Sequence, residues 1–177
     1  MPARIAVIGQ SGQSPAKVLA LAEEVGKLIA QKAGILLTGG TDGIMAAASR
    51  GASLAGGLVV GILPGDDRRL ANSYVDVPIS TGLGFEQRSA VLIHSADSVV
   101  MVAGGNGTLG ELSMAYQNRK NVVVLEGSGG WADLVRAVAP DGYLDPRQTV
   151  KIHYAQTPRE AVELAFSLSD QTAREAI

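Results

Sequence analysis

The residues best suited to chemistry form a glycine-rich stretch, Gly104-Gly105-Asn106-Gly107-Thr108, with Glu111 three residues beyond it. The stretch follows an apolar run typical of a buried strand and precedes a predicted helix. Glycine permits close backbone approach, and a helix N-terminus offers free N–H groups and a positive dipole. The backbone amides of residues 105–108 and the Thr108 hydroxyl could therefore cradle a phosphate. The stretch is neither a G-x-G-x-x-G pattern nor a Walker A loop, since no Gly-Lys-Ser/Thr is present.

Two charged residues could act at this stretch. The Glu111 carboxylate could serve as general acid/base or stabilise an oxocarbenium ion. The alternative is a capping box, with Thr108 as N-cap and Glu111 reaching back to its amide. Arg88 lies on the first turns of another predicted helix, and its planar guanidinium would suit a phosphate or carboxylate, although a solvated helix charge is the simpler interpretation. The residues alone leave these alternatives open.

Other apolar runs end in similar turns. They contain Gly9, Ser11 and Gly12, then Gly39, Gly40 and Thr41, and finally Gly127 and Gly129. Any one of these turns could be an ordinary connection between a strand and a helix, with no role in binding. Because ligands of open α/β sheets bind beyond the carboxyl ends of the strands, four such turns on one rim favour a shared site.

Short apolar runs alternate with helical periodicity along the whole chain. The predicted strands cover residues 5–8, 35–37, 58–63, 98–102, 121–125 and 149–153, with a brief extended piece at 75–77. The predicted helices cover about 14–32, 43–55, 85–95, 108–118 and 131–138, and a last one starts near 157. This alternation predicts a Rossmann-like doubly wound parallel sheet in three α/β/α layers, as one domain over residues 1–177.

Several residues predict element boundaries. Ser14 and Pro15 fit the N-cap and first position of a helix, and Asp42 fits an N-cap. Thr157-Pro158-Arg159-Glu160 is a capping box. Asp97 precedes a strand and is typical of a turn.

Composition narrows the function classes. The 177 residues carry a net charge of −2, and their lysines and arginines are scattered, so we expect no nucleic-acid partner. Cysteine is absent, which excludes disulfides and thiolate ligands and agrees with a cytoplasmic location. No apolar stretch approaches the roughly 20 residues of a membrane helix, so no membrane partner is expected. His94 and His153 lack metal-ligand spacing, and no metal is expected.

A family resemblance follows from these motifs. The residues from Gly104 to Glu111 resemble the P-G-G-x-G-T-x-x-E signature of the LOG-type proteins, a group once described as possible lysine decarboxylases. The turns after the first two strands match as well, and Arg88 falls where the family has its arginine. The resemblance covers about residues 4–125 and implies a Rossmann-like fold, a homodimer or homotetramer, and a phosphate-bearing ligand.

Departures from the signature point to a sister branch. Ala103 replaces the signature's proline, and Ser89 stands where LOG-type enzymes usually have lysine. The sequence A-G-G-N-G-T-L-G-E is similar to a branch related to DNA-processing protein A, which includes molybdenum-cofactor carrier proteins. This branch implies a binding or carrier protein for a phosphorylated small molecule, either an AMP-like nucleotide or molybdenum cofactor, with no required cofactor.

The enzyme alternative is a nucleoside 5′-monophosphate phosphoribohydrolase, which cleaves the N-glycosidic bond and releases free base and ribose 5-phosphate. The resemblance then implies that Glu111 assists departure of the base or activates water, and that Arg88 positions the phosphate or Glu111. No lysine context typical of pyridoxal phosphate supports a decarboxylase.

Overall fold

The chain folds around a seven-stranded sheet in which every pairing is parallel. The computed structural model describes residues 1–175, and side chains through residue 170. The strand order is β4-β3-β2-β1-β5-β6-β7. The strands are β1 (Arg4–Ile8), β2 (Ile35–Thr38), β3 (Val59–Leu63), β4 (Val77–Ser80), β5 (Ser98–Val102), β6 (Asn121–Leu125) and β7 (Ile152–Ala155).

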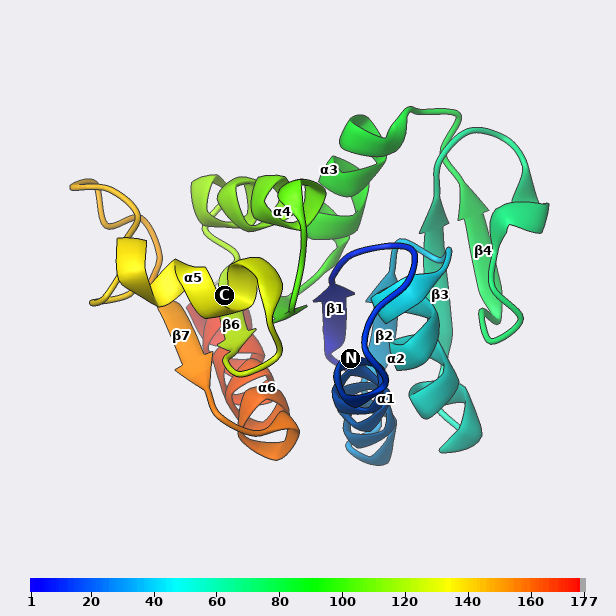
Figure 1. Cartoon of the computed structure of the whole chain (residues 1–177), viewed down its shortest axis with the longest axis horizontal. Helices are drawn as coiled ribbons and strands as arrows, with labels where there is room; N and C mark the ends of the chain where they lie inside the picture. The colour runs from blue at the N-terminus through cyan, green and yellow to red at the C-terminus, as the bar shows by residue number, and fades with distance from the viewer. Residues whose placement is uncertain (176–177) are drawn as a thin grey trace.

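Helices cover both faces of this sheet, as the expected three-layer Rossmann-like fold requires (Figure 1). The helices are α1 (Ala16–Gln31), α2 (Gly43–Leu54), α3 (Phe85–Ser95), α4 (Asn106–Gln117), α5 (Gly130–Val138) and α6 (Pro158–Glu175), with a 3₁₀ turn, η1, at Arg68–Leu70. The buried residues of α1, α2 and α6 pack on one face, and those of α3, α4 and α5 pack on the other.

The central strands are apolar on both faces because each is sandwiched between two helical layers. All five residues of β5, Ser98–Val102, are buried. The strand order reverses between β1 and β5, which pair from Ile5 with Ser98 to Ile8 with Met101. Their connections therefore diverge to opposite faces and open a crevice beyond their carboxyl ends, which is where ligands of such folds bind.

Several of the predicted boundaries differ from the observed ones. The extended piece predicted at 75–77 overlaps the observed strand β4, Val77–Ser80, only at Val77. The last strand starts at Ile152 rather than Thr149. Pro15 is the N-cap of α1, and the Ser14 hydroxyl accepts a hydrogen bond from Gln10. Pairing with β3 and β6 selects the residues that extend in β4 and β7, so local residue preferences do not determine these strand ends.

The predicted caps of two other helices have different outcomes. Asp42 is the N-cap residue of α2, but its side chain makes no capping hydrogen bond. At α6 the Thr157 hydroxyl accepts from the Glu160 amide, and the Glu160 carboxylate accepts from the Gln156 amide. These two bonds form a capping box at α6 with one difference. The carboxylate accepts from the residue before Thr157 and not from Thr157 itself.

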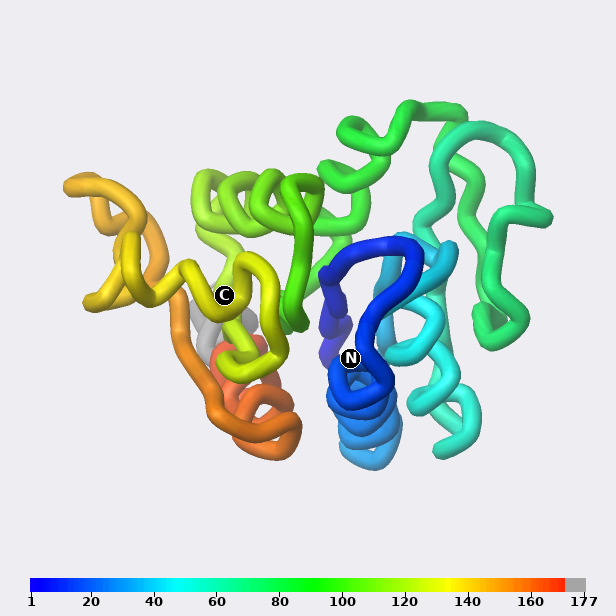
Figure 2. The backbone as a smooth tube through the Cα atoms, viewed as in Figure 1, coloured from blue at the N-terminus to red at the C-terminus, as the bar shows by residue number. Residues whose placement is uncertain are grey.

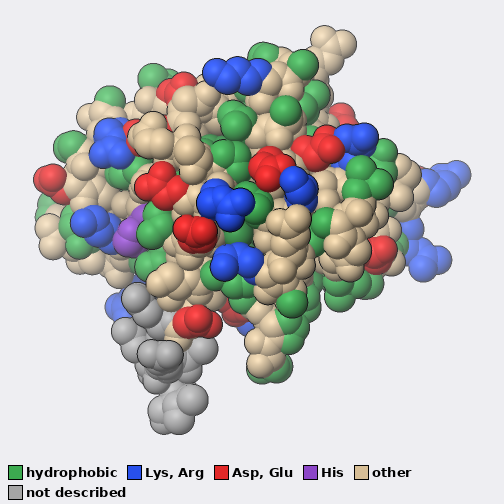
Figure 3. Space-filling view, turned by 90° about the horizontal axis from the view of Figure 1, so that it is seen from below, with side chains coloured by type: hydrophobic (Ala, Val, Ile, Leu, Met, Phe, Trp, Pro, Cys, Tyr) green, Lys and Arg blue, Asp and Glu red, His purple; other side chains and the backbone are tan. Residues whose placement is uncertain are grey.

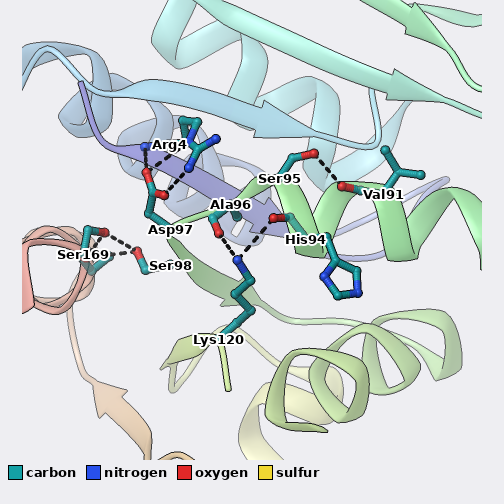
Figure 4. Close-up of polar contacts among 10 residues, drawn as sticks. Arg4, Val91, His94, Ser95, Ala96, Asp97, Ser98, Lys120 and Ser169 are labelled. Carbon is teal, nitrogen blue, oxygen red and sulfur yellow. Dashed lines mark hydrogen bonds and ion pairs between the residues drawn. The ribbon is translucent and has the colours of Figure 1, made fainter. Parts of the chain in front are cut away.

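Asp97 does more than close a turn (Figure 4). It lies between α3 and β5 and accepts hydrogen bonds from the Arg4 backbone amide and guanidinium. Burial opposes ionisation, but the Arg4 bonds hold the pKa of Asp97 below its ordinary value. Lys120 donates nearby to the carbonyls of His94 and Ala96. These contacts fasten the amino ends of β1 and β5, at the end of the sheet opposite the crevice.

The surface seen in Figure 3 carries both signs of charge. Lysine and arginine side chains alternate with aspartate and glutamate across that face, without a broad patch of one sign. Within residues 1–175, no helix has the length and apolar character needed to cross a membrane.

Candidate functional site

A cleft of about 560 Å³ lies at the carboxyl ends of the central strands. The turn after β1 and the segment entering α4 run beside each other there (Figure 2). The lining residues are Gly9, Gln10, Ser11, Thr41, Met45, Phe85, Glu86, Arg88, Ser89, Gly105, Asn106, Gly107, Thr108, Gly110, Glu111 and Met114. The volume falls in the range of about 300–1,000 Å³ that is usual for small-molecule sites.

The N-terminus of α4 offers unpaired hydrogen-bond donors to this cleft. The helix begins at Asn106, Gly105 is its N-cap, and no side chain caps it. No described acceptor is bonded to the backbone amides of Asn106, Gly107 and Thr108. A Cβ added at Gly105 or Gly107 would meet nothing within 4 Å. Three N–H groups and the positive end of the helix dipole are therefore available to an anion.

Arg88 lies beneath the cleft as a buried cation, so the solvated-charge interpretation was wrong. Its side chain is 5% exposed, and Nε and Nη1 have no hydrogen-bond partner among the described residues. Burial lowers the pKa of this guanidinium, and the Glu111 charge partly opposes the change. Leaving buried donors unpaired costs about 1–3 kcal/mol per group or more when charged. Because Arg88 lines the cleft, its positive charge favours an anionic ligand there.

Glu111 faces α3, which contradicts the proposed capping box. Its Oε1 accepts a hydrogen bond from the Ser89 hydroxyl at 2.9 Å. Thr108 is the third residue of α4 and not its N-cap. Burial raises the pKa of Glu111, while the Ser89 hydrogen bond and the charge of Arg88 oppose the rise. A carboxyl whose pKa is raised toward neutrality is suited to hold and transfer a proton.

Hydrogen bonds from α5 and from the loop before it support the β5–α4 turn. Ala103 adopts a φ of 52°, a left-handed conformation that is unfavourable for residues other than glycine. Its amide donates to the buried Ser128 hydroxyl at 2.8 Å. The first amides of α5, from Trp131 and Ala132, donate to the carbonyls of Gly104 and Ala103. Proline cannot adopt this φ and has no N–H, so its replacement by Ala103 fits the turn observed here.

The structure divides the remaining predicted residues into two groups. Gly9, Ser11 and Thr41 line the cleft together with residues 105–108, Arg88 and Glu111. Gly12, Gly39, Gly40 and Gly104 are not among its lining residues. Gly12 instead borders a separate hollow that includes Arg50 and Tyr74. Gly39 lies under Arg88, since a Cβ at Gly39 would lie 2.1 Å from Nη1.

We expected four glycine turns at one edge of the sheet to share a site. This expectation was wrong for the last turn, at Gly127 and Gly129. The amides of Gly127 and Gly129 donate to the two carboxylate oxygens of Asp133. Asp133 thus occupies the position that an anionic ligand would need. At α2 the Ile44 amide donates to the Gln10 carbonyl. Of these turns, the β5–α4 turn is the one that leaves its helix N-terminus open to the cleft.

Sequence reasoning did not assign several lining residues. Phe85, Arg88 and Ser89 have spacings of three and four residues, which place them on one face of α3. That spacing was a usable signal for Phe85 and Ser89. Met45 and Met114 come from other helices and carried no signal. In the part of the chain whose side chains are described, no group of three or more His, Cys, Asp or Glu residues could hold a metal ion.

The fold and the cleft define a Rossmann-like α/β protein with unpaired hydrogen-bond donors at the carboxyl ends of its strands. The chain belongs to the SLOG cluster4 family, whose model matches residues 2–162.

Known proteins agree with this assignment. A crystal structure from the Northeast Structural Genomics Consortium has a TM-score of 0.88 and 40% identity, over 93% of this chain and 99% of that one. The molybdenum cofactor carrier protein of Chlamydomonas reinhardtii has a TM-score of 0.80 and 34% identity, over 95% and 98%. DNA processing protein A of Streptococcus pneumoniae shares the fold, with a TM-score of 0.71 at 16% identity over 92% of this chain and 61% of that one.

A LOG-type relative is more distant. A cytokinin riboside 5′-monophosphate phosphoribohydrolase of Mycobacterium tuberculosis is 28% identical over 170 residues, 89% of this chain and 90% of that protein. The resemblances to LOG-type proteins and to molybdenum-cofactor carriers are therefore confirmed, and the likeness to DNA processing protein A is one of fold.

Proposed function

We propose that this protein binds and carries a phosphorylated small molecule, a molybdopterin-type cofactor or a nucleotide, in the cleft at α4. One observation carries the proposal: the free amides of residues 106–108 lie at a cleft that the cationic side chain of Arg88 also lines. Such donors are suited to phosphate oxygens. The similarity to a molybdenum cofactor carrier at 34% identity supports the pterin class of ligand.

The first test is direct loading. Purified protein is mixed with molybdenum cofactor released from a denatured molybdoenzyme, free cofactor is removed by gel filtration, and the bound pterin is measured by its fluorescence after oxidation. AMP is tested in parallel by calorimetry. Co-elution of the pterin supports the carrier function. Absence of binding by both the cofactor and AMP would refute it.

Gly107→Leu provides a specific site control. A Cβ at Gly107 would meet no protein atom within 4 Å, and Gly107 lines the cleft, so the variant should fold normally and lose the ligand. Leucine also has a higher helix propensity than glycine, by up to about 1 kcal/mol. Gln117→Leu, on the last turn of the same helix and outside the cleft, should bind as the wild type does. Normal binding by Gly107→Leu would contradict the proposed site.

A second candidate function rests on Glu111. Its raised pKa, its place in the cleft and the 28%-identical hydrolase favour cleavage of a nucleoside 5′-monophosphate. Glu111 would then protonate the departing base or activate water. The assay measures free base and ribose 5-phosphate from AMP. Turnover that disappears in Glu111→Gln, with AMP affinity retained, would establish the hydrolase. Binding without turnover leaves the carrier function.

A further inference from the structure

The part of the cleft wall formed by α3 has a different chemistry from the α4 amides. It is formed by the first turn of α3, where Phe85 and Glu86 both line the cleft. Phe85 is 65% exposed, and Met45 and Met114 add apolar surface to the lining. An exposed aromatic ring in the lining of such a cleft is a suitable platform for a planar heterocycle.

Glu86 is an unpaired acid in a cleft that we propose to hold an anion. No hydrogen bond or ion pair connects its carboxylate to another described residue. Its position in the first turn of α3 is favourable to the helix dipole, which is the simplest role for an exposed acid there. That role does not require it to line the cleft. A carboxylate would repel a phosphate, so Glu86 favours a ligand that presents hydrogen-bond donors on its side of the cleft.

A carboxylate with two acceptor oxygens selects among heterocycles. It can accept two parallel hydrogen bonds from a ring that presents an N–H next to an amino group. Guanine and pterin share this 2-amino-4-oxo edge. Adenine presents an amino donor beside a bare ring nitrogen, which would face the second carboxylate oxygen without a proton.

We infer that Glu86 and Phe85 determine which ring the cleft accepts, and that they select the 2-amino-4-oxo edge common to pterins and guanine. The inference rests on the proposed function, because the α4 amides and Arg88 hold the phosphate of the same ligand. Phe85 stacks against the ring. The Arg88 guanidinium lies 5.9 Å from the centre of the Phe85 ring, so the ring platform and the anion site are adjacent.

The test compares four probes by calorimetry: GMP, inosine monophosphate, AMP and neopterin monophosphate. Inosine monophosphate keeps the ring N–H but lacks the amino group. The wild type should bind GMP and neopterin monophosphate best, inosine monophosphate less well and AMP least. A well-placed pair of such hydrogen bonds discriminates by about five- to 150-fold.

Glu86→Gln isolates the contribution of the carboxylate. Glutamine has one acceptor and one donor group, which match adenine, so the ratio of GMP to AMP affinity should fall by about tenfold or more. Phe85→Leu should weaken all four ligands together. Asp42→Asn removes another exposed acid, at the N-cap of α2 and outside the cleft lining, and should leave the ratio unchanged. Thermal unfolding verifies that each variant is folded.

The outcomes separate this inference from the proposed function. Binding of all four probes with similar affinity, or a ratio that Glu86→Gln does not change, would overturn the role of Glu86 and leave the anion site standing. Absence of binding by every probe would overturn both.

Discussion

Replacing Gly39 with alanine should displace Arg88 without unfolding the protein. The new methyl group would lie 2.1 Å from Arg88 Nη1, 2.9 Å from its Cζ and 2.6 Å from Met45 Sδ. Normal contacts between such atoms are about 3.5 Å or more, so the guanidinium must move by more than about 1 Å. Both neighbours are the flexible ends of long side chains, and the backbone at Gly39 can remain in place.

The expected effect is therefore large on binding and small on stability. Loss of one charge-assisted hydrogen bond between Arg88 and a phosphate is worth about 1.5–3 kcal/mol, which corresponds to about 10- to 150-fold weaker binding. Alanine also restricts the unfolded chain, which stabilises by about 0.4–1 kcal/mol and offsets part of the strain. The midpoint of thermal unfolding should change by only a few degrees.

A double-mutant cycle provides the measurement. The dissociation constant of AMP is determined by calorimetry for the wild type, Gly39→Ala, Arg88→Ala and the double variant. If Gly39 acts by making room for Arg88, its substitution should have almost no effect once Arg88 is absent. Unchanged binding by Gly39→Ala would refute this reasoning, and so would an equal loss in the Arg88→Ala background.

Three further substitutions test the support of the site. Ala103→Gly should raise stability by about 1 kcal/mol in denaturant unfolding, because glycine tolerates the φ of 52°; no gain would show that the turn is unstrained. Ser128→Ala should lower it by about 1–3 kcal/mol, since it leaves the Ala103 amide and the Leu125 carbonyl without their buried partner. The raised pKa of Glu111 means that the unfolded state releases its proton first as pH rises. The wild type should therefore lose stability as pH rises from the ordinary glutamate pKa to the higher pKa of Glu111 in the folded state. Glu111→Gln should lack this loss. Parallel profiles of thermal stability for the two proteins from pH 4 to 8 would contradict the raised pKa.

Much of the fold could be predicted because its signals are local. The buried strand 98–102 is a continuous apolar run, and the glycines after it mark a strand-to-helix turn wherever they occur. The alternation of such runs with helical periodicity led directly to the parallel sheet. Errors were confined to ends such as that of β7, where pairing with β6 selects the residues that extend.

The candidate site was predicted in outline, since Arg88, Glu111 and residues 105–108 do meet in one cleft. The relations among them could not be predicted. The capping box of Thr108 and Glu111 has the correct spacing, yet the carboxylate bonds to Ser89, 22 residues earlier in the chain. A local pattern indicates which hydrogen bonds a side chain can form. Which of them does form depends on the partners that other elements bring close to it.

The sequence by itself determined the alternating elements, the order of the turns and the glycine-rich entry to α4, because these depend on backbone geometry and periodicity over a few residues. Only the tertiary structure decided which turn remains open. Asp133 fills the turn at Gly127 and Gly129, and the carbonyls of Ala103 and Gly104 occupy the first amides of α5. The amides at the start of α4 remain free because no other segment of the described chain reaches them.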